Sequence, residues 1–126
     1  MTNPYKGRLG FDRIVHAIGY SFDGLKSAYQ GESAFRQETW AAVVLVPTAL
    51  WLGPTWLEKL LLIGSIVFVM IVELLNSGIE AAIDRISFDR HELSKRAKDQ
   101  ASAAVFLSVL LASATWLTIA WQRFFA

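Results

Sequence analysis

The chain has 126 residues, of which 54% are hydrophobic and 18% charged, and its formal net charge is +1. This length leaves room for a single domain, residues 1–126, and the apolar composition favours a membrane protein. Because cysteine is absent, disulfides and thiolate metal sites are excluded. The first thirty residues lack a continuous apolar core, so we expect no signal peptide.

The first predicted element is an amphipathic helix over residues 8–31. Its apolar side chains recur at spacings of three and four, and charged residues occupy the other faces; the apolar positions are Phe11, Ile14, Val15, Ile18, Phe22, Leu25 and Tyr29. A basic amphipathic helix of this kind is suited to lying on a membrane surface. A surface anchor with no further role is the simplest interpretation of this helix alone.

Three apolar stretches follow, and each is predicted to be a transmembrane helix. The first, residues 35–52, is short, because its apolar part begins only at Thr39 and contains Pro47. A span needs about 20 residues, so this helix has to include polar residues or cross at an angle. The second covers residues 57–84. The third covers residues 99–122 and is uncharged from Ala101 to Trp121.

The basic residues predict how these helices are oriented. Five lie before the apolar part of the first span and five between the second and third spans, whereas only Lys59 and Arg123 lie near the other ends. By the positive-inside rule, the N-terminus and the loop at residues 84–100 are cytoplasmic, and the C-terminus faces outward. This arrangement requires an odd number of spans, which supports counting the short first one.

Four polar residues interrupt the second span: Glu73, Asn76, Glu80 and Asp84. At about 100° per residue they lie along one side of a helix, with Glu73 deepest in the membrane. An ionisable group at such depth costs on the order of 3 kcal/mol, so it favours a functional site. Two simpler interpretations stay open: Asn76 as a hydrogen-bonding contact between helices, and Asp84 as a solvated helix end.

Charged residues elsewhere indicate a phosphate site at the same membrane level. Glu32 and Glu38 precede the apolar part of the first span and would lie level with Glu80, and carboxylates gathered in this way suit Mg²⁺. The predicted loop Asp89–Asp99 holds four basic residues, which fit a polyphosphate, although they also serve as a topology signal. The pattern predicts an enzyme at the membrane surface that joins a soluble phosphate donor to a lipid. The glycine-rich motifs of soluble kinases and nucleotide-binding proteins are missing from the sequence.

The segment ELLNSGIEAAID, residues 73–84, resembles the signature of the small prokaryotic diacylglycerol kinases. GYSFDGLKSAY, GESAFRQE and HELSKRAKDQASAAV are similar to further segments of that family in the same order, so the resemblance covers about residues 10–121. Two positions depart from the family: Gly78 stands where Ser or Ala is usual, and Tyr29 replaces a Trp common in close relatives.

The resemblance implies a homotrimeric helical bundle in the bacterial inner membrane, with active sites shared between protomers and a periplasmic C-terminus. A ridge of small residues at Ala104, Ser108 and Ala112 independently favours close helix association. The implied reaction converts ATP and 1,2-diacylglycerol to ADP and phosphatidic acid, with Mg²⁺.

The resemblance also implies residue roles. Glu73 would be the general base, Asn76 would orient Glu73 or the phosphate, and Lys98 would neutralise the transferred phosphoryl group. Glu32 and Glu80 would hold the metal. The family positions that bind ATP correspond to Arg13, Tyr20, Glu32, Glu80, Asp89, Arg90, His91, Lys98 and Asp99. The lipid side corresponds to Arg36, Glu38, Trp51, Glu73, Ser102 and Trp116.

Two other functions remain possible from the sequence. Some members of the family phosphorylate undecaprenol, and one sequence does not reveal which acceptor the pocket selects. A small ion-conducting oligomer, with Glu73 and Glu80 lining a pathway, would explain buried carboxylates, but not the basic loop or the surface carboxylates. No nucleic acid partner is expected.

Overall fold

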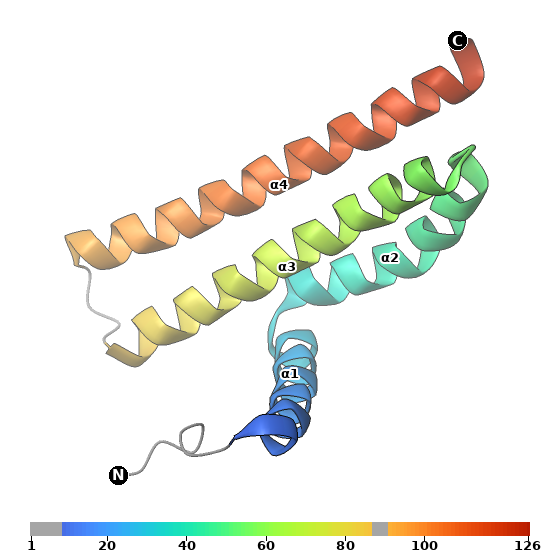
Figure 1. Cartoon of the computed structure of the whole chain (residues 1–126). Coiled ribbons are helices and arrows are strands. Elements are labelled where there is room, and N and C mark those ends of the chain that lie inside the picture. Colours follow the sequence, from blue (N-terminus) through green and yellow to red (C-terminus); the bar gives the residue numbers. More distant parts are fainter. Residues whose placement is uncertain (1–8, 87–90) are drawn as a thin grey trace.

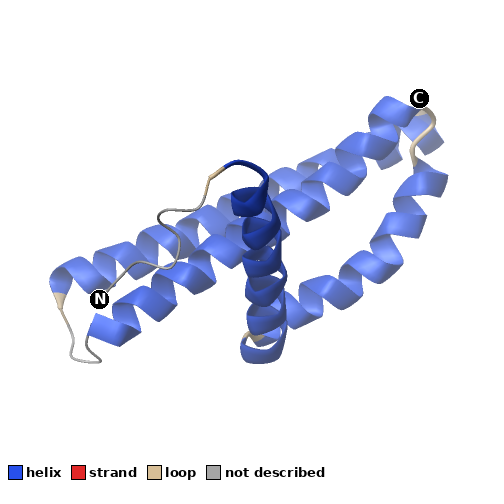
Figure 2. Cartoon of the chain, turned by 60° about the horizontal axis from the view of Figure 1, so that its bottom comes forward, coloured by secondary structure: helices blue, strands red, loops and turns tan. Residues whose placement is uncertain are grey.

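The computed structural model describes residues 9–86 and 91–126, and these residues form four helices. In Figure 1, α3 runs back along α2, α4 lies beside α3, and α1 projects from the start of α2. Figure 2 shows the same arrangement from a second direction. The predicted all-α class is confirmed by four helices with these bounds: α1 Gly10–Gly31, α2 Ser33–Leu52, α3 Trp56–Ile86 and α4 Glu92–Phe125.

The corner between α1 and α2 consists of one extended residue, Glu32. Its backbone N–H donates to the carbonyl of Ala28 at 2.8 Å. The Arg36 guanidinium donates to the carbonyls of Tyr29 (2.8 Å) and Gln30 (3.1 Å), which lie in the last turn of α1. Because the last carbonyls of a helix lack partners within it, these bonds fix the corner. The corner in turn fixes the position of Glu32.

The turn between α2 and α3 is equally well defined. The carboxylate of Glu58 accepts from both the N–H and the hydroxyl of Thr55, which precedes the first residue of α3. At the start of a helix the backbone N–H groups lack partners within the helix, and here the Glu58 side chain provides one. Gly53 is needed here because an added Cβ would lie 2.7 Å from the backbone N of Lys59. The turn therefore directs α3 back along α2.

Two of the described helices, α3 and α4, are long and apolar enough to cross a membrane. Helix α2, the first predicted span, is not apolar enough over its length to be counted with them. It begins with the polar stretch SAFRQET and contains Pro47, so its apolar part is shorter than the helix. The prediction of a membrane protein is supported by two apolar helices, and the third span stays a prediction.

Helix α4 begins earlier than the sequence indicated. Residues 84–100 were expected to form a loop before a helix at 99–122, but α4 starts at Glu92 and His91 caps it through its ring, which accepts from Leu93 N at 3.1 Å. Lys95 and Asp99 pair at 2.7 Å one turn apart. The His91 cap and the Lys95–Asp99 ion pair both favour a helical conformation in this polar segment. The basic residues of the expected loop therefore lie on a helix from Glu92 onward.

The buried core is small and lies where α2, α3 and α4 meet, at the end of α2. It consists of Ala49, Leu52, Leu62 and Ile119. Most large apolar side chains along α3 and α4 are exposed instead. Exposed apolar surface of this extent is typical of helices that face lipid or other chains. Within the predicted ridge of small residues, Ser108 and Ala112 are buried in the chain while Ala104 is exposed.

Candidate active site

The polar residues of α3 are joined by the side chain of Asn76. Its amide nitrogen donates to Glu73 Oε1 at 3.5 Å and to Glu80 Oε1 at 3.3 Å. Spacings of three and four residues place all three side chains on one face of the helix. The amide thus links the two carboxylates that the sequence analysis placed at the centre of the site.

Glu73 is the buried member of this group, with only 6% of its surface exposed. Its charge interacts with those of Glu32 and Glu80, and Glu38 in turn interacts with Glu73. The four carboxylates come from three places: the corner at Glu32, the first turns of α2, and α3. The fold therefore brings Glu32 and Glu38 close enough to Glu73 for their charges to interact, although both are far from α3 in the sequence.

The oxygen atoms of this site are of the type that Mg²⁺ prefers as ligands. Glu32 and Glu80 supply hard carboxylate oxygens, and the buried Oδ1 of Asn76 has no hydrogen-bond partner within the described chain. Among the described residues, no group of three or more Asp, Glu or His side chains lies in a position to hold a metal ion. Mg²⁺ needs none, since it is commonly held by one or two carboxylates plus substrate phosphates and waters.

A groove of about 630 Å³ lies between α1 and α3 beside this acidic group. Glu32, Ser77 and Gly78 are among the residues that line it. A Cβ added at Gly78 would meet nothing within 4 Å in the described structure. The serine or alanine that the family usually carries there would fit, so this departure is sterically neutral within one chain.

One cationic residue near the start of α4 contacts the polar stripe of α3. Lys98 from α4 forms an ion pair with Asp84 at 2.8 Å, which ties the first turns of α4 to the end of α3. Asp99 is held by Lys95 on its own helix. Asp89 and Arg90 lie outside the described residues. Of these predicted ATP-binding residues, the structure thus places Lys98 nearest the acidic face, through its bond to Asp84.

Arg13 and Tyr20 lie on α1. Arg13 is in the first turn, at the end of α1 that points away from the other helices (Figure 1). Tyr20 is half-buried beside the ring of His16, with centroids 6.5 Å apart. Because α1 contacts α3 only weakly, a single chain does not bring Arg13 to the acidic face of α3.

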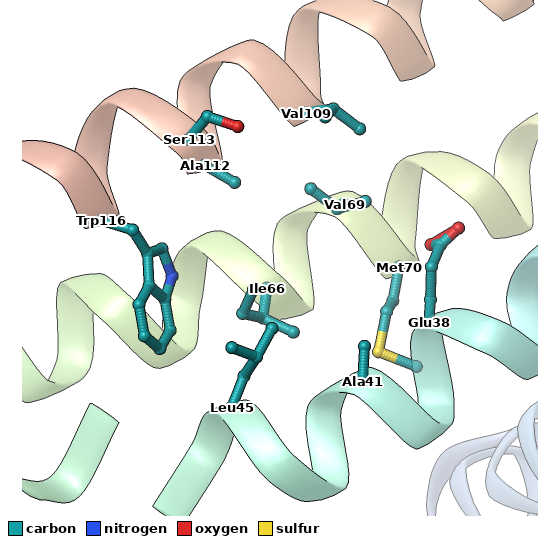
Figure 3. A pocket seen from close by; sticks show the side chains of 10 residues that line it. All are labelled: Glu38, Ala41, Leu45, Ile66, Val69, Met70, Val109, Ala112, Ser113 and Trp116. Atoms are coloured by element: carbon teal, nitrogen blue, oxygen red, sulfur yellow. The ribbon is translucent and has the colours of Figure 1, made fainter. Parts of the chain in front are cut away.

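An apolar pocket of about 340 Å³ opens between α2, α3 and α4 (Figure 3). Glu38 lies at one end, where its Oε1 is buried without a hydrogen-bond partner in the described structure, and Trp116 lies at the other end. Between them the walls are almost wholly apolar. The lining is completed by Ala41, Leu45, Ile66, Val69, Met70, Val109, Ala112 and Ser113.

The remaining residues predicted to bind lipid do not line this pocket. Arg36 fixes the corner after α1. Trp51 is exposed near the end of α2 and packs beside Phe124, with centroids 6.0 Å apart. Ser102 is exposed on α4. Val69 and Met70 line the pocket but were not predicted, although their position about one turn before Glu73 is a signal that the sequence contains.

These features define a helical membrane protein with an apolar pocket between three helices, at one end of which lies Glu38, whose charge interacts with that of the buried Glu73. A family model described as prokaryotic diacylglycerol kinase matches residues 19–120. The chain belongs to this family, so the predicted family, and with it the prediction of a kinase, is confirmed.

Curated relatives from distant bacteria show the same likeness over nearly their whole length. A diacylglycerol kinase of Escherichia coli (strain K12) is 50% identical over 115 residues, which cover 91% of this chain and 94% of the relative. One from Pseudomonas aeruginosa is 48% identical, covering 93% and 95%. One from Helicobacter pylori (strain 26695) is 42% identical, covering 91% and 86%.

Proposed function

We propose that this protein transfers the γ-phosphate of ATP to 1,2-diacylglycerol and so forms phosphatidic acid at the bacterial inner membrane. The observation that carries this proposal is the place of Glu73. It is buried on α3, with the carboxylates of Glu32 and Glu80 as electrostatic neighbours. It also interacts with Glu38, which lines the apolar pocket.

In the proposed reaction Glu73 is the general base. The acceptor hydroxyl oxygen forms a bond to the γ-phosphorus, the bond from that phosphorus to the bridging oxygen breaks, and ADP leaves. The hydroxyl proton passes to the Glu73 carboxylate and later to water. Asn76 orients Glu73 through its hydrogen bond. Catalysis then rests on positioning and on charge stabilisation, as phosphoryl transfer generally does.

The nucleotide side of the proposal uses carboxylates on and beside α3 together with Lys98 of α4. Glu32 and Glu80 would hold Mg²⁺, which neutralises phosphate charge when bound. Lys98 would exchange Asp84 for the transferred phosphoryl group. The remaining proposed ATP contacts are Arg13, Tyr20, Asp89, Arg90, His91 and Asp99.

The lipid side of the proposal uses the pocket of Figure 3. Its apolar walls suit an acyl chain, and Glu38 lies at the end where the glycerol would be. Trp116 would contact the chain at the opposite end. Arg36, Trp51 and Ser102 would contact lipid outside this pocket.

We also propose a homotrimer with shared active sites. Arg13 does not meet the acidic face of α3 within one chain, and a neighbouring protomer can supply such a residue. Exposed small residues such as Ala104 on α4 support close helix packing within the membrane. The proposed topology has three spans, a cytoplasmic N-terminus and a periplasmic C-terminus, as the positive-inside rule predicts.

The test is transfer of labelled γ-phosphate from ATP to dioleoylglycerol in mixed micelles, with undecaprenol assayed in parallel and with Mg²⁺ present or chelated. We expect labelled phosphatidic acid only when Mg²⁺ is present. Label on undecaprenol alone would keep the mechanism but change the acceptor. No label on either lipid, together with ATP-independent ion flux in liposomes, would overturn the proposal in favour of an ion-conducting oligomer.

A further inference from the structure

The indole of Trp116 is held in place by a hydrogen bond between helices. Its Nε1–H donates to Ser65 Oγ on α3 at 3.0 Å. The hydroxyl of Ser65 donates to the carbonyl of Leu62 at 2.7 Å, which leaves its oxygen free to accept from the indole. The orientation of the indole is therefore fixed with respect to α3.

Trp116 also closes the deep end of the apolar pocket. The lining runs along α2 from Glu38 to Leu45 and along α4 from Val109 to Trp116, about two turns on each helix or roughly 10 Å. In Figure 3 the carboxylate of Glu38 and the indole of Trp116 lie at opposite ends. The fixed indole is thus the floor of the pocket.

The depth of this floor matches the length scale of an acyl chain. Ser65 lies eight residues before Glu73 on α3, which corresponds to roughly 12 Å along the helix. Half of a bilayer's hydrocarbon core is about 15 Å thick. Consider a diacylglycerol whose free hydroxyl lies at Glu73. A long acyl chain would then reach the indole of Trp116, whereas a short acyl chain would end before it.

We propose that Ser65 is a positioning residue that sets the acyl-chain preference of the enzyme by fixing Trp116 as the pocket floor. This inference rests on the proposed function, because the chain in the pocket is that of diacylglycerol. Apolar contact alone discriminates poorly, since surrounding lipid tails are as apolar as the pocket. Discrimination comes from shape: a chain longer than the pocket has to turn out at the fixed indole.

The experiment compares kcat/KM for dioctanoylglycerol and dioleoylglycerol in the same mixed micelles. The variants are Ser65→Ala, Trp116→Phe, the two combined, and Ser108→Ala as a matched control. Ser108 Oγ also donates to the carbonyl three residues before it, Val105, at 2.7 Å, but it lies outside the pocket. Loss of stability alone would lower both rates together, so the ratio of the two lipids is the diagnostic quantity.

We expect the ratio for dioleoylglycerol over dioctanoylglycerol to rise at least threefold in Ser65→Ala and in Trp116→Phe, because the floor can then move. The double variant should show no further rise, since both changes remove the same hydrogen bond. Ser108→Ala should keep the parental ratio.

An unchanged ratio in both single variants, or an equal rise in Ser108→Ala, would overturn the inference while leaving the proposed function in place. If Ser65→Ala does not fold, the ratio in Trp116→Phe decides the matter alone. A folded parent that phosphorylates neither lipid would instead overturn the proposed function, and this inference with it.

Discussion

Asn76 is the side chain through which the two main carboxylates of α3 are connected. Replacing it by alanine removes the hydrogen bonds to Glu73 and Glu80. We expect Asn76→Ala to lower kcat for diacylglycerol about 10²-fold, in line with the loss of one well-placed polar group in other active sites. Ser77→Ala is the matched control, because the buried hydroxyl of Ser77 has no hydrogen-bond partner in the described structure. Equal rates in the two variants would contradict this role of Asn76.

Lys98 has an observed contact with Asp84 and a proposed role in catalysis. The two roles predict different effects on stability and on kcat. The pair with Asp84 is more than one-third exposed on both sides, so its contribution to stability is at most about 1 kcal/mol. We expect Asp84→Asn to shift the melting temperature in detergent only slightly. Lys98→Met should also shift it slightly, but should lower kcat by about 10²-fold or more. A Lys98→Met variant that keeps the parental kcat would show that the ion pair is its only role.

At the scale of the elements, the turn between α2 and α3 depends on Gly53. An added Cβ would lie within 3.0 Å of two backbone atoms of Lys59, which cannot move without displacing α3. We expect Gly53→Ala to destabilise the protein by about 1–3 kcal/mol, as overpacking usually does. Gly64→Ala on α3 is the control, because a Cβ there meets nothing within 4 Å in the described structure. Thermal unfolding in detergent compares the two, and equal melting temperatures would contradict the prediction.

Hydrophobic patterning predicted the helices well where apolar runs were long. The bounds of α1 and α3 lie close to the predicted 8–31 and 57–84. The start of α4 was wrong, because a run of charged residues was taken for a loop although its cap and its i,i+4 ion pair favour helix. The span at α2 is ambiguous for a related reason. Its polar first turns contain Arg36 and Glu38, and they shorten its apolar part.

The candidate site was only partly predictable. The stripe from Glu73 to Asp84 is local, and helix geometry alone places its members on one face. The bond between Ser65 and Trp116 joins residues 51 positions apart, and no local pattern indicates such a partner. The pocket of Figure 3 likewise needs three helices at once. The sequence therefore predicted the carboxylates better than it predicted the cavity beside them.

At the scale of the whole molecule, the proposed active site needs more than one chain. We expect the inactive variants Glu73→Gln and Arg13→Ala to regain activity when they are mixed and refolded together, because a trimer can combine an intact α3 with an intact α1 from a neighbour. A mixture of Glu73→Gln and Glu80→Gln is the control, since both changes lie on α3. Lipid phosphorylation after mixing is the measurement. Equal lack of recovery in both mixtures would contradict a shared site.

The central claim is that a buried carboxylate on α3 takes the proton from a lipid hydroxyl. Its most direct test is the rate of phosphate transfer from ATP to dioleoylglycerol by Glu73→Gln beside Glu92→Gln, which changes an exposed carboxylate in the first turn of α4. We predict that Glu73→Gln lowers kcat about 10³-fold, within the range for a general base, and leaves the KM for ATP nearly unchanged. Glu92→Gln should behave as the parent. A folded Glu73→Gln protein whose kcat stays within tenfold of the parent would contradict the claim.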